Sequence, residues 1–280
     1  MNAIEIMGVS KRIRDFSIND LNLVVPGGCV VGLIGENGAG KSTTIKLIMD
    51  LVHKDFGSIK VLGRDNVYGL DDVKHQIGVV FDDCTFPQEL SAIKLGNIMK
   101  LIYRNWDDQK FREYLIRFGL DEKKRIRDYS RGMKMKLSIA VALSHNAKLL
   151  ILDEATSGLD PVVRDEIIDI LIDFTSDEEH SILISSHIIS DLEKICDYIA
   201  FLHKGRLVMF EEKDRLYEQY CTIHCTENDL KRIPVEAIIG SKVGAYGAEA
   251  IVHKESVPEG IERYPIDIEK LFIFMIKERW

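Results

Sequence analysis

A glycine-rich loop in the first fifth of the chain has the residue types needed to hold phosphate groups. Residues 35–42 read GENGAGKS, which matches the spacing G-x-x-x-x-G-K-[ST] of the P-loop. Glycines let the backbone curl so that its N–H groups point at phosphate oxygens, while a lysine can neutralise the β- and γ-phosphates. The expected nucleotide-binding residues of the loop are Gly35, Glu36, Asn37, Gly38, Ala39, Gly40, Lys41, Ser42 and Thr43.

The residues around this loop fit the same chemistry. Residues 29–34 (CVVGLI) form a short apolar run that is typical of a buried strand, and helical spacing follows from Ser42 to about Val52. The N-terminus of that helix adds a partial positive charge where phosphates would lie. The hydroxyl of Ser42 can bind Mg²⁺. We therefore expect nucleotide binding rather than a chance match.

Two carboxylates follow a second apolar run, residues 149–152. If this run is a buried parallel strand, its C-terminal end is the end where ligands bind. Asp153 can then hold the hydration shell of Mg²⁺, and Glu154 can orient and polarise an attacking water. The plain alternative is a strand that ends at solvent, where acidic residues are common. The presence of a P-loop in the same chain favours the catalytic interpretation.

Two further residues have both a structural and a functional interpretation. Asp160 precedes Pro161, the arrangement typical of an N-cap followed by the first residue of a helix. His187 follows the expected strand 181–186. A single histidine after a strand is usually structural, so His187 by itself is a weak sign of function.

The spacing of apolar residues predicts the elements that must position these groups. Strand and helix signals alternate in the first third, helical signals alone fill about 87–147, and strand signals then return. We expect an α/β fold with an all-helical insertion and a small C-terminal α+β extension, divided into domains at 1–220 and 221–280, with the helical subdomain at about 85–147. The expected strands are 21–25, 29–34, 77–81, 149–152, 181–186, 198–203 and 207–210, and the later helices are 91–103, 107–118, 133–143 and 266–277.

Composition excludes several classes of protein. With 46% hydrophobic and 29% charged residues among 280, the chain can bury a sizeable core, which excludes wholesale disorder. A net charge of −8 makes broad binding to a polyanion unfavourable. No apolar run approaches the roughly 18 residues that would span a bilayer. The start shows no secretory signal, so we expect a cytosolic protein whose five scattered cysteines are free thiols.

The order of these motifs resembles the ATP-binding subunit of an ABC transporter. The decisive segment is residues 129–133, YSRGM, just before the acidic strand. It is similar to the signature LSGGQ of that family, which other P-loop kinases and GTPases lack. The resemblance covers about residues 1–220, and the tail lies outside it.

The resemblance implies a P-loop NTPase core of the ABC-ATPase type and a mechanism. Two subunits, identical or close paralogues, bind head to tail around two ATP and Mg²⁺. Each ATP contacts the P-loop of one subunit and Ser130 and Gly132 of the other. Asp153 would act on Mg²⁺, Glu154 on the attacking water and His187 on the γ-phosphate, with Lys41 on the phosphates and Asp160 communicating across the dimer. The permease would be a separate transmembrane partner docked on the helical insertion, which places the chain on the inner face of the membrane.

Three departures from the family pattern stand out. Arg131 and Met133 replace a glycine and a glutamine of the signature, a variant that looks like the branch that exports antibiotics, lipids or other polymers. Asp82 stands where the family has a glutamine; a carboxylate can bind a hydrated Mg²⁺ but cannot donate a hydrogen bond. The aromatic residue that stacks on adenine is expected near Ile13, which is not aromatic. Phe16 could take that role or could simply belong to the core.

The alternative function is a soluble ABC ATPase that acts on DNA or the ribosome. Such proteins usually carry two cassettes or long coiled coils, whereas this chain has one P-loop, no sustained heptads and an acidic balance. We therefore expect no nucleic-acid partner. A binding module without catalysis is disfavoured because Glu154 is present.

Overall fold

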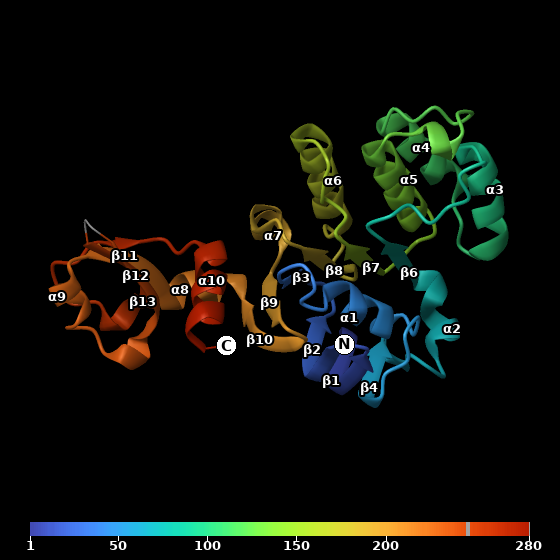
Figure 1. Ribbon diagram of the computed structural model, residues 1–280. Helices are drawn as coiled ribbons and strands as arrows, with labels where there is room; N and C mark the ends of the chain where they lie inside the picture. Colours follow the sequence, from blue (N-terminus) through green and yellow to red (C-terminus); the bar gives the residue numbers. More distant parts are fainter. Residues whose placement is uncertain (245–246, 280) are drawn as a thin grey trace. The chain divides into compact units, whose positions relative to one another are not determined.

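The computed structural model describes residues 1–244 and 247–279, which form two compact units (Figure 1). The units are Met1–Phe210 and Glu211–Trp280, so the boundary lies ten residues before the expected division between 220 and 221. The reason is helix α8 (Lys213–Gln219), which contacts strand β11 (Tyr220–Cys225) and the short helix η4 (Lys254–Ser256) of the second unit.

A six-stranded sheet with the order β10-β9-β3-β8-β7-β6 forms the centre of the first unit. β3, β7 and β8 consist entirely of buried residues, as the apolar runs predicted, and they pair in parallel. Their C-terminal ends therefore meet at one edge, where Ile34 pairs with Ser186 and Asp153 with Ser185. The strands are β3 (Val30–Ile34), β6 (Ile77–Val80), β7 (Leu149–Asp153), β8 (Ser181–Ser186), β9 (Tyr198–His203) and β10 (Arg206–Glu212).

An antiparallel sheet with the order β2-β1-β4-β5 lies beside the central one. Of these strands the sequence pattern predicted only part of β2. Along β1, register shifts interrupt the alternation of side chains at three places. Buried residues of both sheets and of helix α1 form one hydrophobic cluster. The strands are β1 (Asn2–Ile13), β2 (Phe16–Pro26), β4 (Phe56–Val61) and β5 (Arg64–Asp65).

Helix α1 (Lys41–Ile48) begins directly after the glycine-rich loop and contacts both β4 and β7. It ends four residues before the expected Val52. Asp50 has a left-handed backbone with φ of 52°, and the N–H of Leu51 donates to the carbonyl of Lys46 at 2.9 Å. A left-handed residue of this kind closes the last turn of a helix.

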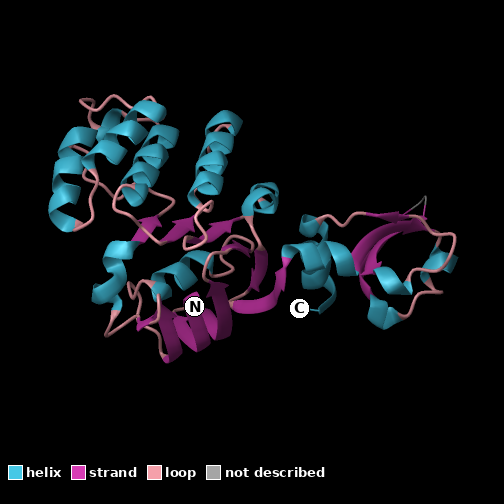
Figure 2. Ribbon diagram, turned by 180° about the vertical axis from the view of Figure 1, so that it is seen from behind, coloured by secondary structure: helices cyan, strands magenta, loops and turns pink. Residues whose placement is uncertain are grey.

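The all-helical insertion is confirmed. Its helices α3 (Ala92–Ile102), α4 (Asp108–Arg117) and α5 (Arg131–Leu143) cluster away from the strands of the antiparallel sheet (Figure 2). α5 contacts α3, α4 and strand β6, so it connects the insertion to the central sheet. Helices α2 (Leu70–Val73), α6 (Pro161–Phe174) and α7 (Ile189–Ile195) complete the unit, and Asp160 is the N-cap of α6 as expected.

The second unit is the expected α+β extension. Its sheet has the order β12-β13-β11-β14, and helix α10 (Ile268–Arg279) packs against β12 (Ile238–Gly244). The contact is close because a Cβ built on Gly240 would lie 2.4 Å from the Cβ of Phe274. The remaining elements are α9 (Glu227–Leu230), η3 (Val235–Ala237), β13 (Gly247–His253) and β14 (Arg263–Tyr264). Across the described residues of both units, we find no helix with the length and apolarity that a bilayer crossing requires.

A buried histidine lies where the insertion joins the central sheet. The ring of His145 stacks on Tyr103 with centroids 3.9 Å apart, and its Nδ1 is 3.1 Å from the carbonyl oxygen of His75. Its Nε2 has no hydrogen-bond partner among the described residues. Burial, which disfavours the charged ring, lowers the pKa of His145 below its ordinary value of 6.5.

Acidification should therefore destabilise the protein through this residue. Below pH 6.5 the unfolded chain binds a proton at His145 that the folded chain excludes, so the free energy of unfolding falls by at most about 1.4 kcal/mol per pH unit from this group. Urea unfolding at pH 7.5 and 5.5, followed by tryptophan fluorescence, should show a smaller loss of stability for His145→Gln than for the parent. His53→Gln, at a largely exposed ring, is the control. An unchanged pH dependence in His145→Gln would contradict the assignment.

Candidate functional site

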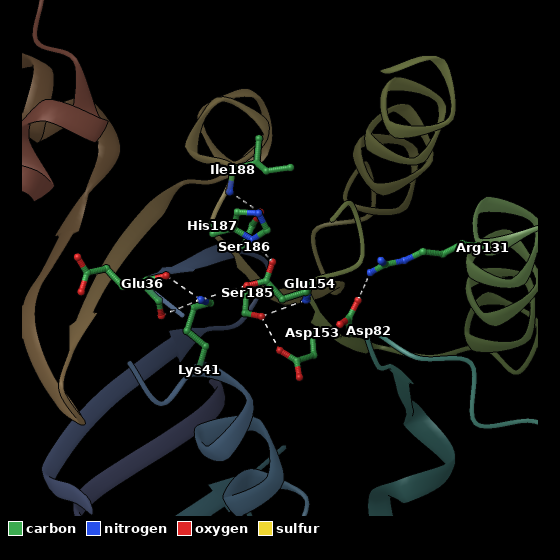
Figure 3. A network of polar contacts seen from close by, with 11 residues as sticks. Glu36, Lys41, Asp82, Arg131, Asp153, Glu154, Ser185, Ser186, His187 and Ile188 are labelled. Atoms are coloured by element: carbon green, nitrogen blue, oxygen red, sulfur yellow. Dashed lines mark hydrogen bonds and ion pairs between the residues drawn. The ribbon is translucent and has the colours of Figure 1, made fainter. Parts of the chain in front are cut away.

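The ammonium of Lys41 is buried at the C-terminal edge of the central sheet (Figure 3). Its Nζ donates to the carbonyl oxygens of Gly35 at 2.6 Å and Glu36 at 3.3 Å, and it lies 3.1 Å from Oε1 of Glu154. A buried charge needs such partners because it has lost its water. The contact joins the glycine-rich loop to the residue that follows β7.

The loop itself requires glycine at Gly40. Its φ of 112° lies in the region that side chains rarely adopt, and a Cβ built there would lie 2.7 Å from Ile18 Cδ1 and 2.9 Å from Phe16 Cζ. Gly40 is also the N-cap of α1 and offers no side chain to cap it. Because the first N–H groups of a helix have no partner within the helix, they are left to bind an anion.

Glu154 is held by two other segments of the chain, the start of α1 and the end of β8 with the residue that follows it. Its backbone is left-handed, with φ of 52°, and its N–H lies 3.1 Å from both the carbonyl oxygen and the hydroxyl of Ser185. Its Oε2 lies 2.7 Å from Nδ1 of His187. The carboxylate therefore turns toward Lys41 on one side and His187 on the other, as Figure 3 shows.

Ser185 orients both acids of the pair. Its hydroxyl donates to Oδ1 of Asp153 at 2.7 Å and accepts from the N–H of Glu154. The sequence pattern indicated no role for Ser185. The strand reads SILISS and contains three serines, so nothing in the pattern distinguishes Ser185, although a completely buried hydroxyl needs a hydrogen-bond partner.

A cavity of about 500 Å³ brings most of the expected site residues together. Its lining contains hydroxyls and carboxylates, the oxygen donors that suit Mg²⁺, together with the ammonium of Lys41 and two apolar side chains. The donor set therefore fits a nucleotide with Mg²⁺. The lining residues are Ile13, Phe16, Glu36, Asn37, Gly38, Gly40, Lys41, Ser42, Thr43, Asp82 and Glu154.

Within the part of the chain that the structure describes, no group of three or more histidine, cysteine or acidic residues could hold a metal ion by protein ligands alone. Mg²⁺ does not need such a group, because it keeps several waters and is usually bound by one or two carboxylates together with phosphates. The roles of Ser42, Asp82 and Asp153 as metal ligands stay predictions.

The structure is compatible with both interpretations of Phe16, as an aromatic residue that stacks on adenine and as a residue of the hydrophobic core. Its side chain lines the cavity beside Ile13, and it also packs against the hydrophobic cluster shared by the two sheets. Stacking of Phe16 on adenine therefore stays a prediction.

Ser130, Gly132 and Asp160 lie outside this lining among the described residues. Ser130 is the N-cap of α5, where its hydroxyl accepts from the N–H of Met133 at 3.2 Å, and Asp160 caps α6 in the same way. A Cβ built on Gly132 would lie 3.5 Å from Val163, so the two helix N-termini are neighbours. A role for them at the nucleotide of a second molecule stays a prediction.

Comparison with known proteins gives a consistent result. A family model described as ABC transporter matches residues 18–157. The lantibiotic transport ATP-binding protein SrtF of Streptococcus pyogenes is 37% identical over 199 residues, which are 70% of this chain and 85% of SrtF. The bacitracin transport ATP-binding protein BcrA of Enterococcus faecalis is 33% identical over 208 residues, or 73% of this chain and 68% of BcrA.

The solved structures agree with the sequences. A structure titled as the ATP-binding subunit of an ABC transporter has a TM-score of 0.70 and 28% identity, and the match covers 76% of this chain and 91% of that one.

Replacement of Lys41 by alanine should strongly weaken nucleotide binding, because it removes the only ammonium that the described residues contribute to the cavity lining. We expect ATP affinity to fall by at least about tenfold, measured by isothermal titration calorimetry. Lys46→Ala, at an exposed residue of the same helix, is the control and should bind like the parent. Parent-like binding by Lys41→Ala would exclude the glycine-rich loop as the phosphate site.

Proposed function

The chain belongs to the ABC transporter family as an ATP-hydrolysing subunit, and we propose that it dimerises around two ATP to power a separate membrane permease. The observation that carries this proposal is the polar cluster at the C-terminal edge of the central sheet, in which the buried Lys41 and the more exposed His187 both contact the carboxylate of Glu154.

Each residue of the cluster has a role that its position supports. Lys41 neutralises negative charge on the phosphates, and His187 contacts the γ-phosphate. Glu154 orients a water and accepts its proton as the water oxygen bonds to the γ-phosphorus and the bond to the β–γ bridging oxygen breaks. The products are ADP and phosphate.

Mg²⁺, when bound, neutralises part of the charge that develops on the phosphate oxygens. Ser42, Asp153 and Asp82 are the residues that would hold it or its waters. Ser185 supports the role of Asp153 because its hydroxyl donates to Oδ1 of that carboxylate and fixes its orientation, although Asp153 itself does not line the cavity among the described residues.

The dimer is proposed from residues that one chain does not use at its own cavity. Ser130 and Gly132 stand at the N-terminus of α5, and Asp160 stands at that of α6. Helix N-termini favour anions. A second copy, or a close paralogue, would bring them to the γ-phosphate from the opposite side.

Export is proposed from the relatives and from the signature variant. SrtF and BcrA are named for transport of a lantibiotic and of bacitracin, both antibiotics. We propose an antibiotic, lipid or polymer-like substrate, chosen by the permease. The permease would dock on the insertion at residues 85–147, which would hold this chain at the inner face of the membrane.

Glu154→Gln should separate binding from hydrolysis. An amide cannot accept the proton of the attacking water, so we expect turnover to fall at least about 100-fold while ATP binding persists. The ATP-bound variant should also elute as a dimer in size-exclusion chromatography. Glu179→Gln, in an exposed ion pair with Lys148, is the control. If turnover of Glu154→Gln stays within about threefold of the parent, less than ~1 kcal/mol of barrier, Glu154 is not the base.

Affinity purification from detergent-solubilised membranes should test the permease. We expect a tagged chain to recover a membrane protein encoded beside it, and removal of residues on the insertion surface should reduce that recovery. A chain that never associates with a membrane component would refute the transport role, whatever its ATPase activity.

A further inference from the structure

We propose that Arg131 is a positioning residue that neutralises Asp82 at the wall of the nucleotide cavity and so permits a triphosphate to bind. The inference rests on the proposed function, since it assumes that ATP occupies this cavity. It assigns a role to a residue that was otherwise only a departure from the signature pattern.

The contact between the two residues is direct. Nη2 of Arg131 lies 2.5 Å from Oδ1 of Asp82 (Figure 3), and each side chain is about half exposed, at 51% and 48%. Asp82 lines the nucleotide cavity and also a second cavity of about 500 Å³, which Arg131 and Lys134 line from the other side. Asp82 therefore stands between the nucleotide site and the N-terminus of α5.

The charges of the nucleotide cavity explain why Asp82 needs a cation. Its lining carries three carboxylates, on Glu36, Asp82 and Glu154, against the single ammonium of Lys41. That ammonium already lies 3.1 Å from Glu154. Without Mg²⁺, a triphosphate would add negative charge to a cleft that is already negative, which is unfavourable unless a cation from outside the lining compensates. Arg131 supplies such a cation through its ion pair with Asp82.

Arg131 is poorly suited to its own helix. It is the first residue of α5, at the positive end of the helix, and the first turn contains no acidic residue. A cation at this end is destabilising. Asp82, from a different part of the chain, offsets that repulsion.

The guanidinium also packs closely against the backbone of Gly158. A Cβ built on Gly158 would lie 2.7 Å from Nη1 and 3.0 Å from Cζ of Arg131, and Gly158 has a φ of 65°. The side chain thus lies against the turn that precedes α6 while it reaches Asp82. Exposed ion pairs usually contribute little to stability. This ion pair differs from an ordinary surface contact in two ways: Arg131 packs against Gly158, and Asp82 lies in the cavity wall.

The experiment measures ATP affinity of the full chain by calorimetry, once in EDTA and once with Mg²⁺. We expect Arg131→Ala to lose at least about fivefold in affinity in EDTA and clearly less with Mg²⁺, because the metal neutralises the nucleotide and can occupy the freed Asp82 carboxylate. Arg131→Lys should stay within about twofold of the parent, since it keeps the cation. Asp82→Asn combined with Arg131→Ala should restore affinity in EDTA.

The controls separate charge from structure. Arg117→Ala breaks an ion pair of similar exposure between α4 and α6, and it should bind ATP like the parent under both conditions. Unchanged affinity in Arg131→Ala, or an equal loss with and without Mg²⁺, would overturn the inference while leaving the proposed function intact. If the parent itself binds no ATP, the proposed function fails, and this inference fails with it.

Discussion

The structure of the site depends on one buried ammonium. Lys41 is only 5% exposed, so it must find oxygen atoms to replace its water, and it takes them from the loop carbonyls of residues 35 and 36 and from Glu154. Those oxygens come from the segments that follow β3 and β7, two strands that are far apart in sequence. Satisfying a single charge therefore fixes the distance between the glycine-rich loop and Glu154, the residue that we propose to act on water.

The central sheet makes this arrangement possible. β3 and β7 are not adjacent; β8 lies between them and contributes Ser185, whose hydroxyl contacts both acidic residues. Parallel pairing brings all three C-terminal ends to one edge. The antiparallel sheet and α1 share a hydrophobic cluster with this sheet, so the loop that begins α1 is supported by the core and not by the ligand.

Much of this arrangement is readable from the sequence because it depends on local pattern. The glycine-rich loop, the buried strands β3, β7 and β8, and the helices of the insertion all show a clear period or a fixed spacing. β1 was missed because bulges break its alternation. α1 was expected to be too long because the left-handed Asp50, which ends it, has no strong sequence signal.

The sequence pattern could not predict which side chains from distant segments contact each other. Ser185 meets Asp153 across 32 residues, and Arg131 meets Asp82 across 49. Each partner taken alone resembles an ordinary polar residue, and only the strand order and the position of α5 bring the pairs together. Asp82 was expected as a metal ligand, and its ion pair with a signature residue could not be foreseen from either motif.

The left-handed backbone of Glu154 lowers the stability of the protein at the same residue that we propose for catalysis. A residue with a β-carbon is strained at a φ of 52°, and the hydrogen bonds from its N–H to Ser185 hold it there. Glycine or asparagine would adopt this conformation with less strain. Selection for thermal stability alone would thus favour residues that relax this turn, and each such replacement would remove the carboxylate that we propose as the base.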